Sequence, residues 1–113
     1  MNEVRRDDGE LCGFVATRGD GWVALTVFGA ELGRTHDEES ARALVMRKGL
    51  AALADRWELR ARCEDEWQTV CIQEANPRRI RLALGYYSLP GVPTRELSVE
   101  DIRSGEFELR LRG

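Results

Sequence analysis

The stretch THDEESARALVMRKGLAALADRW, residues 35–57, decides the predicted fold because it carries the long helical pattern of the chain. Thr35 and Glu38 have the spacing of a capping box, and Asp37 is an alternative N-cap, so a helix is expected to begin here. Residues 41–54 favour helix except at Gly49, which costs a helix about 1 kcal/mol relative to alanine. The pattern therefore predicts one long helix that ends near Trp57.

Apolar residues lie on two sides of this predicted helix, and a helix of that kind is usually buried on both. The stripe expected to cover a sheet consists of Ala43, Met46, Leu50, Leu53 and Trp57. The second face consists of Ala41, Leu44, Val45, Ala51 and Ala52, with Lys48 beside them. We expect this second face to contact either the later strands of the same chain or a second copy, and we favour the homodimer.

Strand patterns flank the helix on both sides. Before it, residues 11–18 and 22–28 form a hairpin around Gly19-Asp20-Gly21, and a third strand is expected around Leu32. After it, strands are expected at residues 58–63, 67–74, 80–86 and 107–111, with a helical turn from Ser98 to Ile102. The predicted order is β-β-β-α-β-β-β-(short α)-β. The fold class is α+β, with antiparallel sheet or sheets on one long central helix.

Length and composition favour one ordered domain over residues 1–113, with residues 1–10 as a flexible N-terminus. The chain is 42% hydrophobic and 33% charged, and its net charge of -3 gives no strong positive field for nucleic acid. Neither a signal peptide nor an apolar run of membrane-spanning length is found. An odd number of cysteines without CxxC spacing fits a reducing compartment, so we expect a cytoplasmic protein that contacts no membrane.

Two segments are candidate binding sites. Arg78, Arg79 and Arg81 follow Asn76-Pro77 at the expected tip of a hairpin, where they can reach phosphates, an acidic partner or glutamates of the same sheet. Residues 86–93 combine Tyr86, Tyr87 and Leu89 with prolines that keep the segment out of a sheet. Tyrosine is enriched at protein interfaces, although such a loop can also fold back over a core.

Catalytic and metal chemistry finds little support in these residues. His36 is the single histidine and lies in the polar region where the helix is expected to begin. Cys12, Cys63 and Cys71 lack the paired spacing of zinc ligands, and we expect them to be packed thiols on strand faces. We therefore predict no catalytic residue, no metal and no cofactor, and interpret the protein as a non-enzyme.

Residues 11–57 resemble two known modules. The text Gly21-Trp22-Val23-Ala24, followed by Gly33-Arg34-Thr35 and an alanine-rich helix, resembles the N-terminal part of HicB-type antitoxins. It is also similar to the three-stranded DNA-binding module of phage-integrase arm domains. The first resemblance implies a protein partner and the second implies DNA, for which only Arg18 and Arg34 lie on the first three strands.

The sequence is best interpreted as a small cytoplasmic binding or regulatory protein that acts through a protein interface, as antitoxins, immunity proteins and adaptors do. The alternative is a nucleic-acid-binding protein that uses the hairpin of Arg78, Arg79 and Arg81. An enzyme or small-ligand-binding protein is the third hypothesis, because no nucleophile has a base close to it in the sequence.

Overall fold

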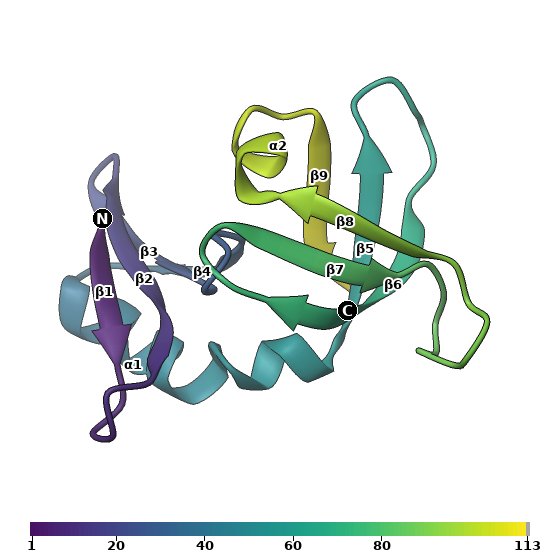
Figure 1. The fold of residues 1–113 in the computed structure, drawn as a ribbon. Coiled ribbons are helices and arrows are strands. Elements are labelled where there is room, and N and C mark those ends of the chain that lie inside the picture. Colours follow the sequence, from purple (N-terminus) through teal and green to yellow (C-terminus); the bar gives the residue numbers. More distant parts are fainter. Residues whose placement is uncertain (113) are drawn as a thin grey trace. The chain divides into compact units, whose positions relative to one another are not determined.

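The computed structural model describes residues 1–112 and confirms the α+β class with antiparallel sheets (Figure 1). The first compact unit, Met1–Ala52, contains β1 (Asn2–Arg5), β2 (Leu11–Arg18), β3 (Gly21–Leu25), β4 (Glu31–Thr35) and α1 (Glu38–Lys48). The chain from Leu53 onward forms a second unit with β5 (Arg56–Ala61), β6 (Gln68–Ala75), β7 (Arg79–Ala83), β8 (Thr94–Ser98), α2 (Val99–Arg103) and β9 (Phe107–Leu111). A 3-10 turn, η1 (Ala51–Ala54), spans the boundary. The single domain over residues 1–113 stays a prediction.

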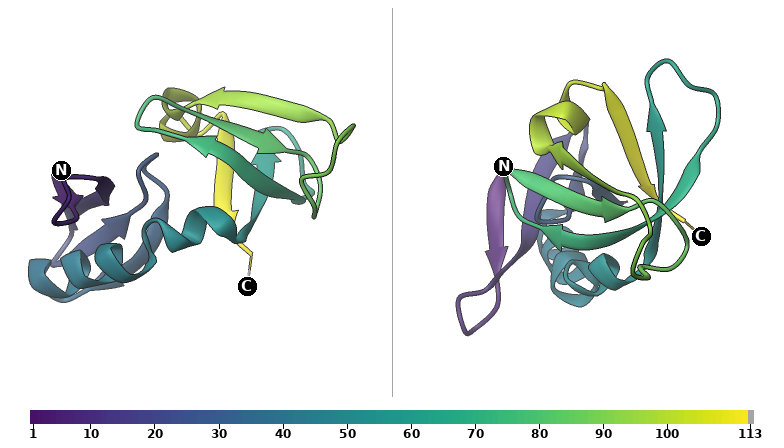
Figure 2. Two further views of the ribbon diagram at one scale, coloured as in Figure 1. Left: turned by 60° about the horizontal axis from the view of Figure 1, so that its bottom comes forward. Right: turned by 45° about the vertical axis from the view of Figure 1, so that its right-hand side comes forward.

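The first unit is a four-stranded antiparallel meander with α1 along one face (Figures 1 and 2). Its core contains Val4, Cys12, Val15, Ala24, Ala41 and Val45. The predicted hairpin is confirmed, with Arg18 opposite Gly21 and Gly19 at a φ of 59°, but its second strand ends at Leu25 rather than at Phe28. A left-handed residue at this tight turn is cheapest as glycine.

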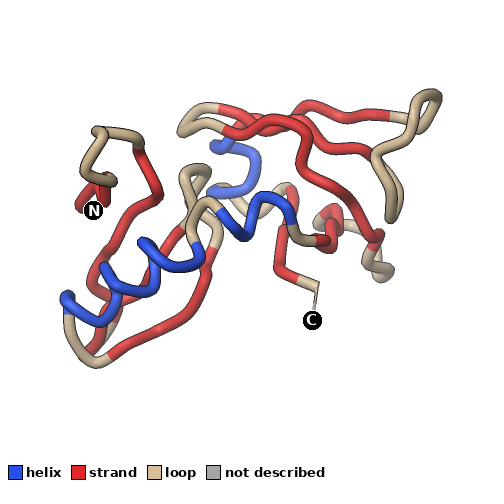
Figure 3. Tube along the Cα trace, turned by 90° about the horizontal axis from the view of Figure 1, so that it is seen from below, coloured by secondary structure: helices blue, strands red, loops and turns tan. Residues whose placement is uncertain are grey.

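The predicted long central helix is wrong, because α1 has only 11 residues and ends at Lys48. Of the two predicted caps, the alternative is confirmed: Asp37 is the N-cap, and its side chain accepts a hydrogen bond of 2.7 Å from the Ser40 amide. The expected capping box of Thr35 and Glu38 is wrong, because the Thr35 hydroxyl donates to the Asp37 carbonyl instead. The helix ends at Gly49, where the backbone passes so close to β2 that a Cβ would lie 2.4 Å from the Cys12 carbonyl oxygen. Figure 3 shows the interruption between α1 and the turn η1. Trp57 accordingly belongs to strand β5 and is fully buried.

The predicted faces of the helix are wrong at four positions of α1, although Leu50 of the sheet-covering stripe does pack against the first core. Ala41 and Val45, assigned to the second face, are fully buried in the core of the first unit, whereas Ala43 and Met46 of the supposed sheet-covering stripe are exposed. The reason is size. Small residues at positions 41, 45 and 49 let the helix approach β2 closely, and Val45 Cγ1 would lie 2.9 Å from a Cβ at Gly13.

The second unit is a five-stranded antiparallel sheet in the order β8-β7-β6-β5-β9. β7 and β8 run across the direction of β5 and β9 (Figures 1 and 2), so the sheet is strongly coiled. The edge strands β8 and β9 are joined by α2, which packs on both. The predicted capping of this turn is confirmed, since Ser98 and Asp101 form a complete capping box. The face opposite the buried side chains of β5, β6 and β7, among them Trp57, Val70 and Ile80, is called the outer sheet face.

Strands β1 and β8 are missing from the predicted order. Each lies at the edge of its sheet and buries one apolar side chain, Val4 in β1 and Leu97 in β8. An edge strand is half solvated and often charged, so alternation gives little signal there. Residues 2–5 pair with β2, and the predicted flexibility of residues 1–10 in solution stays a prediction. Within residues 1–112, no helix is long and apolar enough to cross a membrane.

Candidate functional site

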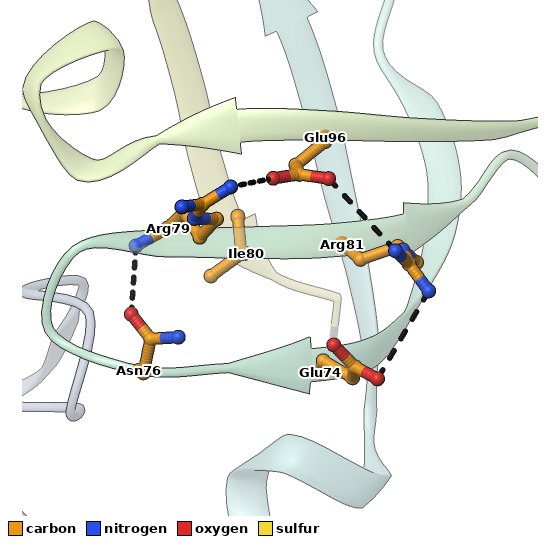
Figure 4. Close-up of a pocket in the computed structure, with 6 residues that line it drawn as sticks. All are labelled: Glu74, Asn76, Arg79, Ile80, Arg81 and Glu96. Carbon is orange, nitrogen blue, oxygen red and sulfur yellow. Dashed lines mark hydrogen bonds and ion pairs between the residues drawn. The ribbon is translucent and has the colours of Figure 1, made fainter.

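The arginine hairpin of the sequence analysis is the turn between β6 and β7. The Asn76 side-chain oxygen accepts hydrogen bonds from the amides of Arg78 and Arg79, at 2.8 and 3.0 Å. This arrangement fixes the turn locally, since an asparagine side chain can replace a backbone acceptor. It sends the side chains of Arg79 and Arg81 onto the outer sheet face (Figure 4).

Carboxylates of the neighbouring strands neutralise two of these arginines. Glu96 of β8 accepts a hydrogen bond of 2.6 Å from Arg79 and lies 3.9 Å from Arg81, and Arg81 is also 3.9 Å from Glu74 of β6 (Figure 4). The hydrogen bond and charge of Arg79 lower the pKa of Glu96, and the same contact raises the pKa of Arg79. The four groups line a polar hollow of about 330 Å³ whose charges balance.

Arg78 differs from its two neighbours. Its side chain is exposed, and within residues 1–112 it has no carboxylate within 4 Å. It lines a second hollow of about 400 Å³ together with Arg79, Glu96, Leu97 and Ser98. The hairpin therefore has one arginine without a carboxylate partner, although its sequence contains three arginines.

The second predicted segment, here called the tyrosine loop and defined as residues 84–93, connects β7 to β8. Its ends are joined by a hydrogen bond of 2.8 Å from the Leu84 amide to the Pro93 carbonyl. Tyr86, Tyr87 and Leu89 are 45%, 60% and 61% exposed, so the loop does not fold back over a core at these positions. Among residues 1–112, the other large apolar side chains that are exposed are Met1 and Met46.

Side chains of β6 hold the base of the tyrosine loop. The Cys71 thiol donates to the carbonyl oxygens of Gly85 and Tyr86, at 3.4 and 3.0 Å, and Gln73 donates to the Ser88 hydroxyl at 2.9 Å. Tyr86 and Tyr87 then pack edge to face, with ring centroids 4.9 Å apart. The loop is thus fixed at its base while its tip presents apolar groups to solvent.

Two arginines that the sequence analysis missed lie against these tyrosines. The guanidinium of Arg56 is 4.7 Å from the Tyr86 ring centre and 5.6 Å from that of Tyr87, and Arg112 is 5.3 Å from Tyr86. They are adjacent because the Arg112 amide donates to the Arg56 carbonyl at 3.0 Å. A signal was present: Arg56 and Arg112 occupy polar positions in two segments whose apolar residues alternate.

Farther along strands β5 and β9, two arginines contact the ring of Trp67, and both are also paired with glutamates. Arg60 and Arg110 lie 4.4 and 3.8 Å from the ring centre of Trp67. Arg60 pairs with Glu108 at 2.9 Å, and Arg110 pairs with Glu58 at 3.0 Å. Because these arginines already have both an aromatic and a carboxylate partner, this cluster serves the sheet rather than a ligand.

The remaining candidates lie apart from this surface. Of the helix candidates, Ala41 and Val45 are buried, Leu44 is half-buried against the first core, Lys48 is exposed, and Ala52 is buried in η1. His36 is exposed before α1. The expected packing holds for Cys12 and Cys71 but is wrong for Cys63, which is exposed after β5 ends at Ala61. Within the described part of the chain, no three histidine, cysteine or acidic side chains converge as metal ligands do.

Comparisons of the chain with protein-family models, curated proteins and solved structures gave no match in any of the three. The resemblance of residues 11–57 to antitoxin and integrase modules therefore gains no support.

Proposed function

We propose that this chain is a small, non-enzymatic cytoplasmic protein that binds a protein partner through the tyrosine loop. The observation that carries the proposal is the exposure of Tyr86, Tyr87 and Leu89 on one loop whose base is fixed. Interfaces are enriched in tyrosine and arginine, and their hot spots are formed by such side chains.

The fixed base of the loop supports this proposal. Binding is weakened when a loop must be ordered as the complex forms, and the hydrogen bonds from Cys71 and Gln73 remove part of that cost in advance. The edge-to-face contact of Tyr86 and Tyr87 restricts the two rings in the same way. The loop thus exposes apolar side chains and is also ordered locally. A loop that only links two strands needs neither property.

Binding of nucleic acid by the arginine hairpin is the weaker proposal. A phosphate would have to replace Glu96 at Arg79 and Arg81, and only Arg78 is left without a carboxylate in the described structure. Non-specific nucleic-acid binding requires several unpaired cations along one surface. The acidic net charge of -3 adds repulsion.

Site-specific photo-crosslinking tests the protein-binding proposal. A photo-crosslinking amino acid replaces Leu89 in one variant and Met46 in a control variant, because both side chains are large, apolar and exposed, at 61% and 47%. The cells from which the protein comes are irradiated, and the crosslinked products are identified by mass spectrometry. The variant with the crosslinker at position 89 should give discrete protein adducts, and the variant with it at position 46 should not give the same adducts. The proposal fails if position 89 gives no adduct beyond the control.

A further inference from the structure

The arginines beside the tyrosine loop differ in their charge balance from most others of the second unit. Carboxylates lie within 4 Å of six arginines there: Arg60, Arg62, Arg79, Arg81, Arg103 and Arg110. Within residues 53–112, Arg56 and Arg112 have no such partner, and both converge on Tyr86. Two uncompensated positive charges therefore gather at the base of the exposed loop.

Arg56 carries a further unmet requirement. It is half-buried, and its Nε is removed from solvent without a hydrogen-bond acceptor anywhere in residues 1–112. Its Nη1 reaches only the Ala54 carbonyl, at the long distance of 3.4 Å. A buried donor without an acceptor is unfavourable, so this arginine is incompletely satisfied within the chain. Of its guanidinium nitrogens only Nε is both buried and unpaired, which leaves the Nη groups as donors for an arriving carboxylate.

We infer that the partner presents a carboxylate from an acidic segment to Arg56 and Arg112, with apolar side chains of that segment against Tyr87 and Leu89. This inference rests on the proposed protein-binding function and specifies the chemistry of the partner. A tyrosine face leaves the edge of a guanidinium free, so one arginine can stack on Tyr86 and still bind a carboxylate in a bidentate manner.

The surroundings favour isolated carboxylates over a phosphate chain. Farther along the same strands, Glu58 and Glu108 are paired with Arg110 and Arg60, so this part of the sheet face has no unpaired cation. A polyanion that follows the strands would gain no further positive charge there, whereas one acidic side chain needs only Arg56 and Arg112. Tyr87 and Leu89 also offer area that a phosphate backbone does not use.

The test is an NMR titration of the full chain with a capped six-residue peptide in which glutamates flank two leucines. We expect shifts of the Arg56 and Arg112 side-chain Nε–Hε signals and of the Tyr86 and Tyr87 ring signals, with an affinity that falls as salt rises. Arg112→Gln should weaken binding about threefold, and Arg56→Gln combined with Arg112→Gln about tenfold. Arg103→Gln is the matched control, since it removes an exposed arginine elsewhere, and should leave the affinity unchanged.

Three results would overturn the inference. The first is equal binding of a peptide in which glutamines replace the glutamates. The second is tighter binding of oligothymidylate or of inorganic phosphate at the same arginines. The third comes from crosslinking at position 89. If the adducts persist undiminished in the Arg56→Gln, Arg112→Gln double variant, the partner is not an acidic segment, although the protein-binding function still holds. If no adducts form even in the protein that retains both arginines, the protein-binding function itself is wrong.

Discussion

At the scale of single residues, the outer sheet face is governed by which arginine meets which carboxylate. Glu96 of β8 contacts both Arg79 and Arg81, and Glu74 of β6 supplies the second negative charge, so these two arginines of the hairpin are neutralised. Nothing equivalent approaches Arg56 or Arg112 in the described structure. The same residue type is therefore paired with carboxylates at one end of the surface and left with aromatic neighbours at the other, where we propose that it binds a partner.

The pKa of Glu96 gives a residue-scale prediction. Its pKa is lowered in the folded chain by the Arg79 hydrogen bond, so its contribution to stability is present above the unfolded pKa and is lost as the pH falls through the folded pKa. Arg79→Gln should return the pKa toward its ordinary value and reduce this acid sensitivity. Carbon-detected NMR titration of the Glu96 carboxyl measures it, and an unchanged pKa in Arg79→Gln would contradict the assignment, with Arg103→Gln as the control.

At the scale of elements, α1 is determined by close packing rather than by helical propensity. It ends with Gly49 as its C-cap, at a position where the close approach of β2 leaves no room for a side chain. Its buried face is the one with the smaller residues, Ala41 and Val45, because these allow the helix to lie close to the sheet. Larger apolar residues such as Met46 consequently remain in solvent.

Adjacent positions on α1 test the corrected faces. Val45→Ala removes two methyl groups from a fully buried site and should lower the free energy of unfolding by about 2 kcal/mol. Met46→Ala, at a 47% exposed side chain, should change it by less than about 0.5 kcal/mol. Urea denaturation of both variants measures the difference. A larger loss for Met46→Ala than for Val45→Ala would restore the face assignment made from the sequence.

Gly49→Ala separates propensity from packing. Helix propensity alone predicts that alanine stabilises by about 1 kcal/mol. The structure predicts the opposite sign, a loss of about 1–3 kcal/mol, because the new Cβ would lie 2.4 Å from the Cys12 carbonyl oxygen. Thermal unfolding of the variant gives the sign directly, and a raised melting temperature would show that the contact between α1 and β2 is looser than described.

The elements that could be predicted from the sequence are those with a strong local signal. The Gly19-Asp20-Gly21 turn, the Asp37 cap and the Ser98–Asp101 capping box each depend on a few neighbouring residues. The end of α1 depends instead on β2, whose contact with Gly49 involves residues far apart in the chain. Helical propensity in residues 50–54 therefore could not reveal that Trp57 belongs to a strand.

The candidate site divides in the same way. Tyr86, Tyr87 and Leu89 could be found because prolines keep their segment out of the sheet. Arg56 and Arg112 reach the same place only through the pairing of β5 with β9, and strand register is a property of the folded sheet. Pairing of the hairpin arginines with glutamates of the same sheet was an expected alternative. Glu96, the partner of Arg79, could not be found in this way, because strand β8 was absent from the predicted order.

At the scale of the whole molecule, the exposed apolar groups indicate which surfaces are free. Ala41 and Val45 are covered within the first unit, so a homodimer, which stays a proposal, would need a surface other than these two residues. The tyrosine loop offers one, since it contains three of the large exposed apolar side chains of the described chain.

Leu44→Glu tests whether the helix contributes to any dimer. Leu44 is half-buried, and its Cδ2 lies over Gly33 of β4, 2.9 Å from where a Cβ would be. We expect the variant to lose about 2 kcal/mol or more of stability and to keep the wild-type mass. Light scattering and thermal unfolding measure both quantities. A stable variant whose mass falls from near 26 kDa to the 12.8 kDa of one chain would identify this face as the dimer contact.

Because the Cys71 thiol donates a hydrogen bond to the Tyr86 carbonyl, its rate of chemical modification reports how often the tyrosine loop opens. Alkylation requires access to sulfur, so Cys71 reacts only during the moments when the segment above it lifts, and its labelling rate reports how often that happens. Cys63, being exposed, sets the rate of the unhindered reaction, and Cys12, buried in the first core, reports the opening of that core. One alkylating reagent therefore measures the opening rates of the tyrosine loop and of the first core in the same native chain, with Cys63 as the reference. A bound partner that covers the loop should slow only the reaction of Cys71.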